Sequence, residues 1–176
     1  MENFDETAFI ANISNIFVKT YTAVMLDKMS EVEHFMSDEV YSKFVNNVED
    51  LKQKNQRQMY DELNVKSCHL DGIDEVGENY VAKVTLVARY LDYILDLNEH
   101  KIISGQDNYR AVDTYSLEFT KSKDAKKRGI ITKCPTCGQS LETNNSGLCK
   151  FCRTTFKQED YDWVMTKIEK VNHDFE

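Results

Sequence analysis

The chain has 176 residues, of which 41% are hydrophobic and 11% aromatic, and it contains one proline and six glycines. This composition allows one packed domain of ordinary size with a small appendage, and it excludes a disordered chain and a low-complexity linker. The net charge of −8 is unevenly spread, because residues 121–157 hold nine basic and two acidic side chains, which leaves −15 for the rest of the chain.

Three amphipathic helices are predicted at the start of the chain. Apolar residues recur at helical spacing over residues 6–29, and Asp5 is a suitable N-cap. The sequence that begins at Ser30 fits a capping box and predicts a short second helix. A third helix with its own apolar stripe begins after Ser37 or Asp38.

The pattern then changes to that of strands. Residues 63–70 and 73–76 are predicted strands on either side of a turn, and residues 80–97 form a longer strand. One face of that strand carries Ala82, Val84, Leu86, Ala88 and Tyr90. Residues 99–108 are predicted to be a loop, and residues 112–120 alternate cleanly as a further strand. Helices followed by an antiparallel sheet predict an α+β domain.

Beyond this sheet the sequence predicts a charged hairpin tip over residues 121–128 and a short strand over 130–132. The segment that starts at Tyr161 is predicted to be a short helix, with Trp163, Val164 and Ile168 on its buried side.

Four cysteines give the strongest chemical signal. Cys134 and Cys137 form one CxxC pair, Cys149 and Cys152 form a second, and eleven residues separate the pairs. Two such pairs predict two tight knuckles whose four thiolates hold one structural zinc ion, with no open coordination position for catalysis. Gly138 follows the first pair, where the chain must turn sharply.

Other interpretations of the cysteines are weaker. A redox motif needs only one pair and usually lies in a βαβ unit, and two disulfides would need an oxidising compartment. The N-terminus is acidic, without the basic start of a signal peptide, and no apolar run approaches the ~20 residues that span a bilayer. We therefore expect a cytoplasmic protein without a transmembrane segment. The fifth cysteine, Cys68, is predicted to be a small buried hydrophobic residue.

With these motifs the chain resembles a bacterial Tim44-like domain protein, a family named for the peripheral motor-anchoring subunit of the mitochondrial inner-membrane import translocase. The resemblance is most specific in residues 110–119, in Ser122-Lys123-Asp124, in Cys134-Pro135-Thr136-Cys137-Gly138 and in Tyr161-Asp162-Trp163-Val164. It implies a fold like that of nuclear transport factor two, in which a curved antiparallel sheet wraps around helices into a cone. It also implies a role in protein transport, with a protein or an anionic membrane surface as partner.

The resemblance and the cysteine spacing together divide the chain into three parts. Residues 1–129 are expected to form the Tim44-like α+β domain, residues 130–157 the zinc ribbon, and residues 158–176 a C-terminal helix and tail. The basic segment either docks on the acidic domain or presents a basic face to an anionic partner.

The first functional hypothesis is a non-enzymatic, zinc-containing interaction module, cytoplasmic or peripheral to a membrane. Aromatic side chains would line an apolar pocket in the cone, or else fill the core: Tyr90, Tyr93, Tyr115 and Phe119. Basic side chains of the hairpin would contact an anionic surface: Lys121, Lys123, Lys126, Lys127 and Arg128.

Two other function classes stay open. Cone folds of this type host isomerases and dehydratases, for which His69 and Asp92 are the candidate catalytic residues. The ribbon could instead bind nucleic acid, with Lys150 and Arg153 joining the basic hairpin at phosphates and Phe151 stacking on a base. The acidic remainder of the chain would repel such a backbone, so this class ranks third.

Overall fold

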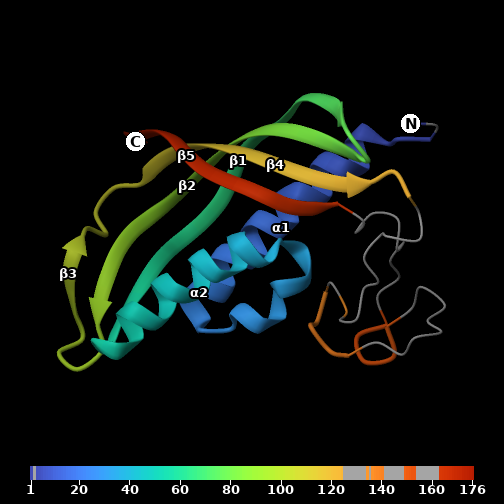
Figure 1. Cartoon of the computed structure of the whole chain (residues 1–176). Coiled ribbons are helices and arrows are strands. Elements are labelled where there is room, and N and C mark those ends of the chain that lie inside the picture. Colours follow the sequence, from blue (N-terminus) through green and yellow to red (C-terminus); the bar gives the residue numbers. More distant parts are fainter. Residues whose placement is uncertain (2, 125–133, 135, 141–148, 154–162) are drawn as a thin grey trace.

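The computed structural model describes residues 1, 3–124, 134, 136–140, 149–153 and 163–176. In this part of the chain, two long helices lie against one curved antiparallel sheet, which wraps over them (Figure 1). The predicted α+β class, with N-terminal helices on a curved antiparallel sheet, is confirmed.

Helix α1 (Glu6–Leu26) is the central helix of the core. Its N-cap is Asp5, whose carboxylate accepts a hydrogen bond from the Ala8 N–H at 3.0 Å, as the sequence predicts. It ends where Asp27 adopts a left-handed backbone with φ 54°. Among the described helices, only α1 is long and apolar enough to cross a bilayer. Its apolar side is here the buried side of a core helix, formed by Phe9, Ile13, Ile16, Phe17, Thr20, Tyr21, Ala23 and Val24.

Two single 3₁₀ turns, η1 (Met29–Glu31) and η2 (Glu33–Phe35), stand where the sequence predicted a short helix. They lead into helix α2 (Asp38–Gln53), which starts after Ser37. The Ser37 hydroxyl accepts a hydrogen bond from the Val40 N–H, which confirms the predicted cap.

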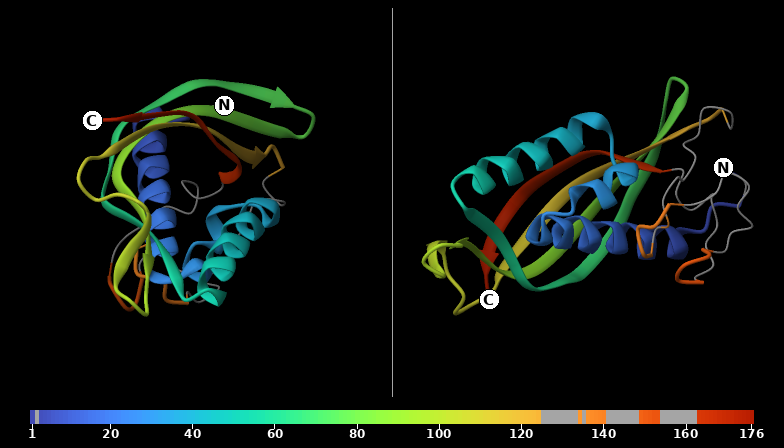
Figure 2. Two further views of the ribbon diagram at one scale, coloured as in Figure 1. Left: turned by 90° about the vertical axis from the view of Figure 1, so that its left-hand side faces the viewer. Right: turned by 90° about the horizontal axis from the view of Figure 1, so that it is seen from below.

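Five strands form one sheet: β1 (Gln56–Val76), β2 (Asn79–Asp96), β3 (Lys101–Gly105), β4 (Ala111–Ser122) and β5 (Val164–Phe175). Their order is β1-β2-β4-β5, and β3 pairs with the far end of β2 beside β4. All ladders are antiparallel, and the sheet curves strongly around the helices (Figure 2). The β2–β4 ladder runs from Asn79–Ser122 to Tyr90–Ala111 without a register shift, so it is the regular centre of the sheet.

Two predictions about the sheet differ from the structure. The turn predicted at Asp71-Gly72 is a register shift within one long strand, because β1 continues on both sides of it and bends there. The loop predicted over residues 99–108 contains the short strand β3. Its last residue, Gly105, has φ 75°, and a Cβ atom there would collide with the carbonyl oxygen of Asp92. Only glycine lets β3 approach β2 this closely.

The prediction of a C-terminal helix over residues 158–176 is wrong, since residues 164–175 form strand β5. Val164 and Ile168 are spaced as on one face of a helix, which is why a helix was predicted. In the structure, register shifts in the β4–β5 ladder allow a strand to place Ile168 opposite Leu117. β4 would otherwise present an open edge, and pairing with β5 satisfies its backbone groups. The sequence-predicted ribbon strand over 130–132 and residues 158–162 lie outside the described part of the chain.

Alternate residues of β2 and β4 form the floor of the core, as the alternation in the sequence predicts. From β2 these are Ala82, Val84, Leu86, Ala88 and Tyr90, and from β4 they are Ala111, Asp113, Tyr115, Leu117 and Phe119. Trp163 precedes β5 and is also buried, with its ring centroid 5.3 Å from that of Phe9. The C-terminal strand therefore belongs to the same core as α1.

Candidate functional site

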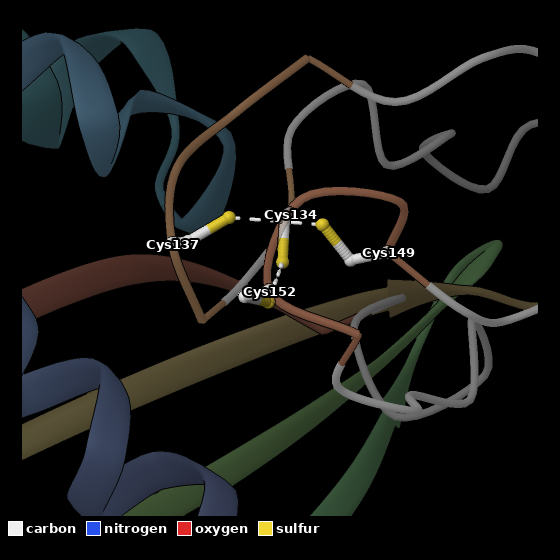
Figure 3. A group of neighbouring side chains, drawn as sticks. All are labelled: Cys134, Cys137, Cys149 and Cys152. Carbon is white, nitrogen blue, oxygen red and sulfur yellow. Dashed lines mark hydrogen bonds between the residues drawn. The ribbon is translucent and has the colours of Figure 1, made fainter.

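The four cysteines of the two CxxC pairs come together at one end of the molecule (Figure 3). All four Sγ atoms lie within 4.8 Å of one another, and the Cys134–Cys152 and Cys137–Cys149 distances are both 3.7 Å. Four sulfurs at ~2.3 Å from a central zinc ion would be about 3.8 Å apart in a tetrahedron. The sulfurs are too far apart for disulfides, whose S–S bond is about 2.05 Å. The donor set and spacing therefore suit one tetrahedral metal ion.

The two knuckles repeat the same backbone geometry. The N–H of Gly138 donates to the Cys134 carbonyl at 2.9 Å, and the N–H of Arg153 donates to the Cys149 carbonyl at 2.9 Å. Each donor directly follows the second cysteine of its pair and has a positive φ, 76° for Gly138 and 58° for Arg153. Within the second knuckle, the backbone N–H groups of Cys152 and Phe151 lower the pKa of the Cys149 thiol. The second knuckle thus favours the Cys149 thiolate. In the first knuckle the backbone of Gln139 acts to lower the pKa of Cys137, but desolvation and the other three thiols together raise it.

The cysteine cluster packs against the N-terminal helices. Cys134 and Cys149 are buried. A Cβ atom on Gly138 would lie 3.5 Å from Cγ of Glu31 in η1. Lys19 of α1 is half-buried, and its desolvation lowers its pKa, while the nearby Cys134, Cys137 and Cys152 act in the opposite direction. Lys19 is therefore a cationic side chain close to the cysteine cluster.

The basic side chains predicted to meet an anionic surface are partly engaged within the molecule. Lys123 Nζ lies 2.7 Å from a carboxylate oxygen of Glu75 and 5.4 Å from the ring centroid of Tyr80. Lys121 Nζ lies 5.9 Å from the ring centroid of Trp163. Lys126, Lys127 and Arg128 lie outside the described residues.

The candidates for nucleic-acid contact lie at the second knuckle. Lys150, Phe151 and Arg153 are all exposed there, and Phe151 is 69% exposed.

A pocket of about 590 Å³ opens between α1, α2 and the start of β1. Its apolar floor is formed by Tyr21, Val24, Phe44, Val48, Leu51, Tyr60 and Leu97. Its polar rim includes Arg57, Asn47 within α2 and Asn55 just after it. The ion pair of Lys52 with Asp27, at 2.8 Å, also belongs to this rim. An apolar floor with a polar rim and this volume are typical of binding sites for small molecules or for a few partner side chains.

The aromatic residues predicted to line the pocket lie elsewhere. Tyr90, Tyr115 and Phe119 are buried in the core beneath α1, where close packing is their role. Tyr93 borders a different, smaller cavity of about 190 Å³ at the end of β2. The larger pocket instead depends on Tyr21 and Tyr60, which come from a helix and from the first part of β1.

The candidate catalytic residues are not brought together. His69 is exposed on β1 opposite Thr85, and Asp92 lies seven positions further along β2, roughly 20 Å away at strand spacing. Asp92 accepts a hydrogen bond from Gln58 Nε2 at 2.7 Å. Cys68 is partly buried and packs against the core, and burial raises the pKa of its thiol. A buried, unreactive thiol agrees with the role predicted from the sequence.

A buried polar network at the centre of the sheet was missed by the sequence analysis. Asp113 is the only fully buried charged residue among those the structure describes. Its carboxylate accepts from the Tyr90 hydroxyl, from Lys170 Nζ at 3.0 Å and from His173 Nδ1. The hydroxyls of Tyr90 and Tyr115 are 2.6 Å apart. The sequence does contain a signal for this network. Asp113 is charged, yet it occupies an inward position in residues 111–119, where the other inward residues are apolar.

The buried tyrosines Tyr21, Tyr60, Tyr90 and Tyr115 should ionise only as the protein unfolds. Burial raises the pKa of each of the four. Because the neutral form is favoured in the folded state, their contribution to stability is complete below the unfolded pKa of about 10 and is lost at higher pH. An absorbance titration of tyrosinate should show exposed tyrosines ionising first and these four later, together with loss of circular dichroism.

Ionisation of all tyrosines in one step near pH 10, with the circular dichroism intact, would contradict the expectation.

Comparison with known proteins identifies the domain that carries these sites. A model of the Tim44-like domain matches residues 1–129. The chain belongs to the Tim44-like family. The search of curated proteins found no match. The resemblance predicted from the motifs is thereby confirmed for this domain, and it leaves the cysteine segment and β5 outside the matched residues.

Two solved structures are similar to the whole Tim44-like chain. A periplasmic fragment of TraM has a TM-score of 0.53 at 7% sequence identity, with 95% of this chain and 97% of that chain covered. The intermembrane space region of the chloroplast protein ARC6 has a TM-score of 0.48 at 11% identity, with 96% and 97% covered. The TM-score of 0.53 shows that the TraM fragment shares the fold of this chain, and at 7% identity the similarity is one of fold alone.

Proposed function

We propose that this chain is a non-enzymatic interaction module whose Tim44-like domain binds an apolar group of a partner in the pocket between α1, α2 and β1. The observation that carries the proposal is the 590 Å³ pocket with its apolar floor and polar rim. The apolar group could be supplied by a protein segment or by a lipid chain at an anionic membrane surface, to which the module would attach peripherally. Membership of the Tim44-like family supports a binding role of this kind and a place in protein transport.

The pocket is tested by filling it. Val48 lies on the floor of the pocket in α2, so Val48→Phe should occupy part of the space and reduce the fluorescence of bound anilinonaphthalene sulfonate several-fold. The matched control is Val171→Phe, because Val171 is 55% exposed on β5 and does not border the pocket. Equal fluorescence for Val48→Phe and the unchanged chain would contradict the proposal.

The source of the apolar group is decided by vesicle sedimentation. Co-sedimentation with phosphatidylglycerol vesicles at low salt, weakened by Val48→Phe and absent with phosphatidylcholine vesicles, would identify an anionic membrane surface. If the chain binds the apolar dye but stays in the supernatant with both kinds of vesicle, a protein segment is the partner.

The second part of the proposal is one structural zinc ion held by Cys134, Cys137, Cys149 and Cys152. The 3.7 Å sulfur spacings and the paired knuckle geometry support it. Such an ion supplies folding free energy and no chemistry, since cysteines fill all four positions. Its attachment beside Lys19 and Glu31 would hold the segment between β4 and β5 against the N-terminal helices.

Metal analysis tests this part. The purified chain should contain one zinc per molecule, and Cys149→Ser should lose it, whereas Cys68→Ser should keep it because Cys68 lies on β1 away from the cluster. Chelation should change the near-ultraviolet circular dichroism and leave the helices in place. Protein purified under reducing conditions without any bound metal would contradict the assignment.

A further inference from the structure

The smaller cavity, of about 190 Å³, lies where the end of β2 meets β3 and the end of β5. It shares Gln58 with the larger pocket but is otherwise lined by different residues, and it lies at the opposite end of the sheet from the cysteines (Figure 1). It is lined by residues of β1, β2 and β5 and by residues 104–106, among them Asp92, His173 and Phe175, while Tyr93 also borders it but directs its hydroxyl to Asp61. A volume of this size holds about six water molecules, or one small organic molecule.

The buried Asp113 determines which His173 atom is available in this cavity. Lys170 and Tyr90 both contact the Asp113 carboxylate, so it is held as an anion and can only accept hydrogen bonds. The Nδ1 atom of His173 contacts the same carboxylate and must therefore carry the proton. In the neutral imidazole Nε2 is then an acceptor, and the side chain is 43% exposed.

Asp92 is the second acceptor in the cavity. Its Oδ1 atom accepts from Gln58 Nε2 at 2.7 Å, and Oδ2 has no protein donor among the described residues. Two other carboxylates act on the neighbouring Tyr93. The hydroxyl of Tyr93 donates to Asp61, and this bond, its desolvation and the charges of Asp61 and Asp107 raise its pKa to about 12.

The cations near the cavity are already engaged. Lys170 contacts Asp113, and Arg110 forms an ion pair with Glu62. Among the described lining residues, the amide N–H groups of Gln58 and Gln106 donate within the protein, which leaves Asp92, His173 and Phe175 for a ligand. Hydrogen-bond donors with positive charge complement both the acceptors and the rings, because ammonium groups are attracted to carboxylates and to aromatic faces.

We propose that this cavity is a binding site for a small organic ammonium ion, with Asp92 and Nε2 of His173 as its acceptors and the ring of Phe175 against its apolar part. Asp113 is a positioning residue for this site, since it fixes the tautomer of His173. The site is distinct from the apolar pocket proposed above, although Gln58 borders both.

Benzylammonium tests the proposal, with benzyl alcohol as its uncharged counterpart. Nuclear magnetic resonance spectra should show saturable millimolar binding of benzylammonium. The shifted signals should be the amides of residues 104–106 and 173–175. Benzyl alcohol should not produce these shifts.

Variants sharpen the test. Asp92→Asn should weaken benzylammonium binding at least ten-fold, whereas Asp74→Asn, the same charge change in an exposed pair with Lys83, should leave it unchanged. Val48→Phe should also leave it unchanged, because Val48 borders only the larger pocket of the two. Equal affinity in Asp92→Asn, equal binding of benzyl alcohol, or no shifts at residues 104–106 and 173–175 would overturn the proposal.

Discussion

A chain that ends at residue 162 is expected not to fold as a stable monomer, although it contains the whole segment matched by the family model. Its missing part carries Trp163 and Met165, which are 4% and 1% exposed in the core. It also carries Lys170 and His173, two of the partners of the buried Asp113. Circular dichroism and thermal unfolding of the shortened and full chains measure the effect.

The expected loss of folding free energy is comparable with the whole stability of a domain. Truncating a buried methionine or tryptophan costs about 2–5 kcal/mol each, and removing the partner of a buried charge costs about 3–5 kcal/mol. Their sum is on the order of 10 kcal/mol, and a whole domain is stable by only about 5–15 kcal/mol. The open β4 edge would in addition favour aggregation.

Complementation separates the loss of β5 from a general effect of truncation. A synthetic peptide of residues 163–176 should restore the circular dichroism of the shortened chain, and the same peptide with Met165→Asp should not. A shortened chain that melts cooperatively at the temperature of the full chain would show that β5 is not part of the domain's folding unit.

The second large effect is expected for Asp113→Ala. The substitution removes the common acceptor of Tyr90, Lys170 and His173 and leaves polar groups in the core without a partner. The expected loss is about 3–5 kcal/mol, which lowers the melting temperature by about 10 °C or more in a chain of this length. Chemical denaturation measures the free energy directly.

The control for this change is Asp74→Ala. Asp74 pairs with Lys83 at 2.9 Å on the surface, and both side chains are more than half exposed. An exposed pair contributes less than about 1 kcal/mol, so this variant should remain close to the unchanged chain. Similar stability of the Asp113 and Asp74 variants would show that the Asp113 network does not stabilise the core.

Local patterns were sufficient to predict the elements whose packing follows from their own sequence. The apolar spacing and caps of α1 and α2 predicted both helices. The alternation of Ala82 to Tyr90 and of Tyr115 to Phe119 predicted the inward faces of β2 and β4. In each case one face is apolar and becomes the buried face, so burial and secondary structure require the same pattern.

Elements that depend on a distant partner could not be predicted in this way. β5 forms because its backbone can pair with the open edge of β4. Its own sequence does not decide its structure, because a short segment with two apolar positions fits a helix or a bulged strand equally well. β3 depends on Gly105, whose role is visible only when the backbone of Asp92 lies against it.

The same distinction applies to the candidate sites. The cysteine cluster was predictable because the ligand spacing is contained in two short motifs. The network of Asp113 was not, because it requires the register that places His173 opposite Asp113. The pocket likewise forms from residues of α1, α2 and β1 that no sequence spacing relates.

The position of β5 also determines the order in which the sheet can assemble. β1 and β2 are joined by the two residues Gly77 and Glu78, whereas β4 ends at Ser122 and β5 begins at Val164. Closing the longer connection costs about 2–3 kcal/mol more in chain entropy. β5 is therefore the strand expected to pair last and to detach first. Trp163, the only tryptophan of the chain, lies at its base, so its fluorescence would report this single step.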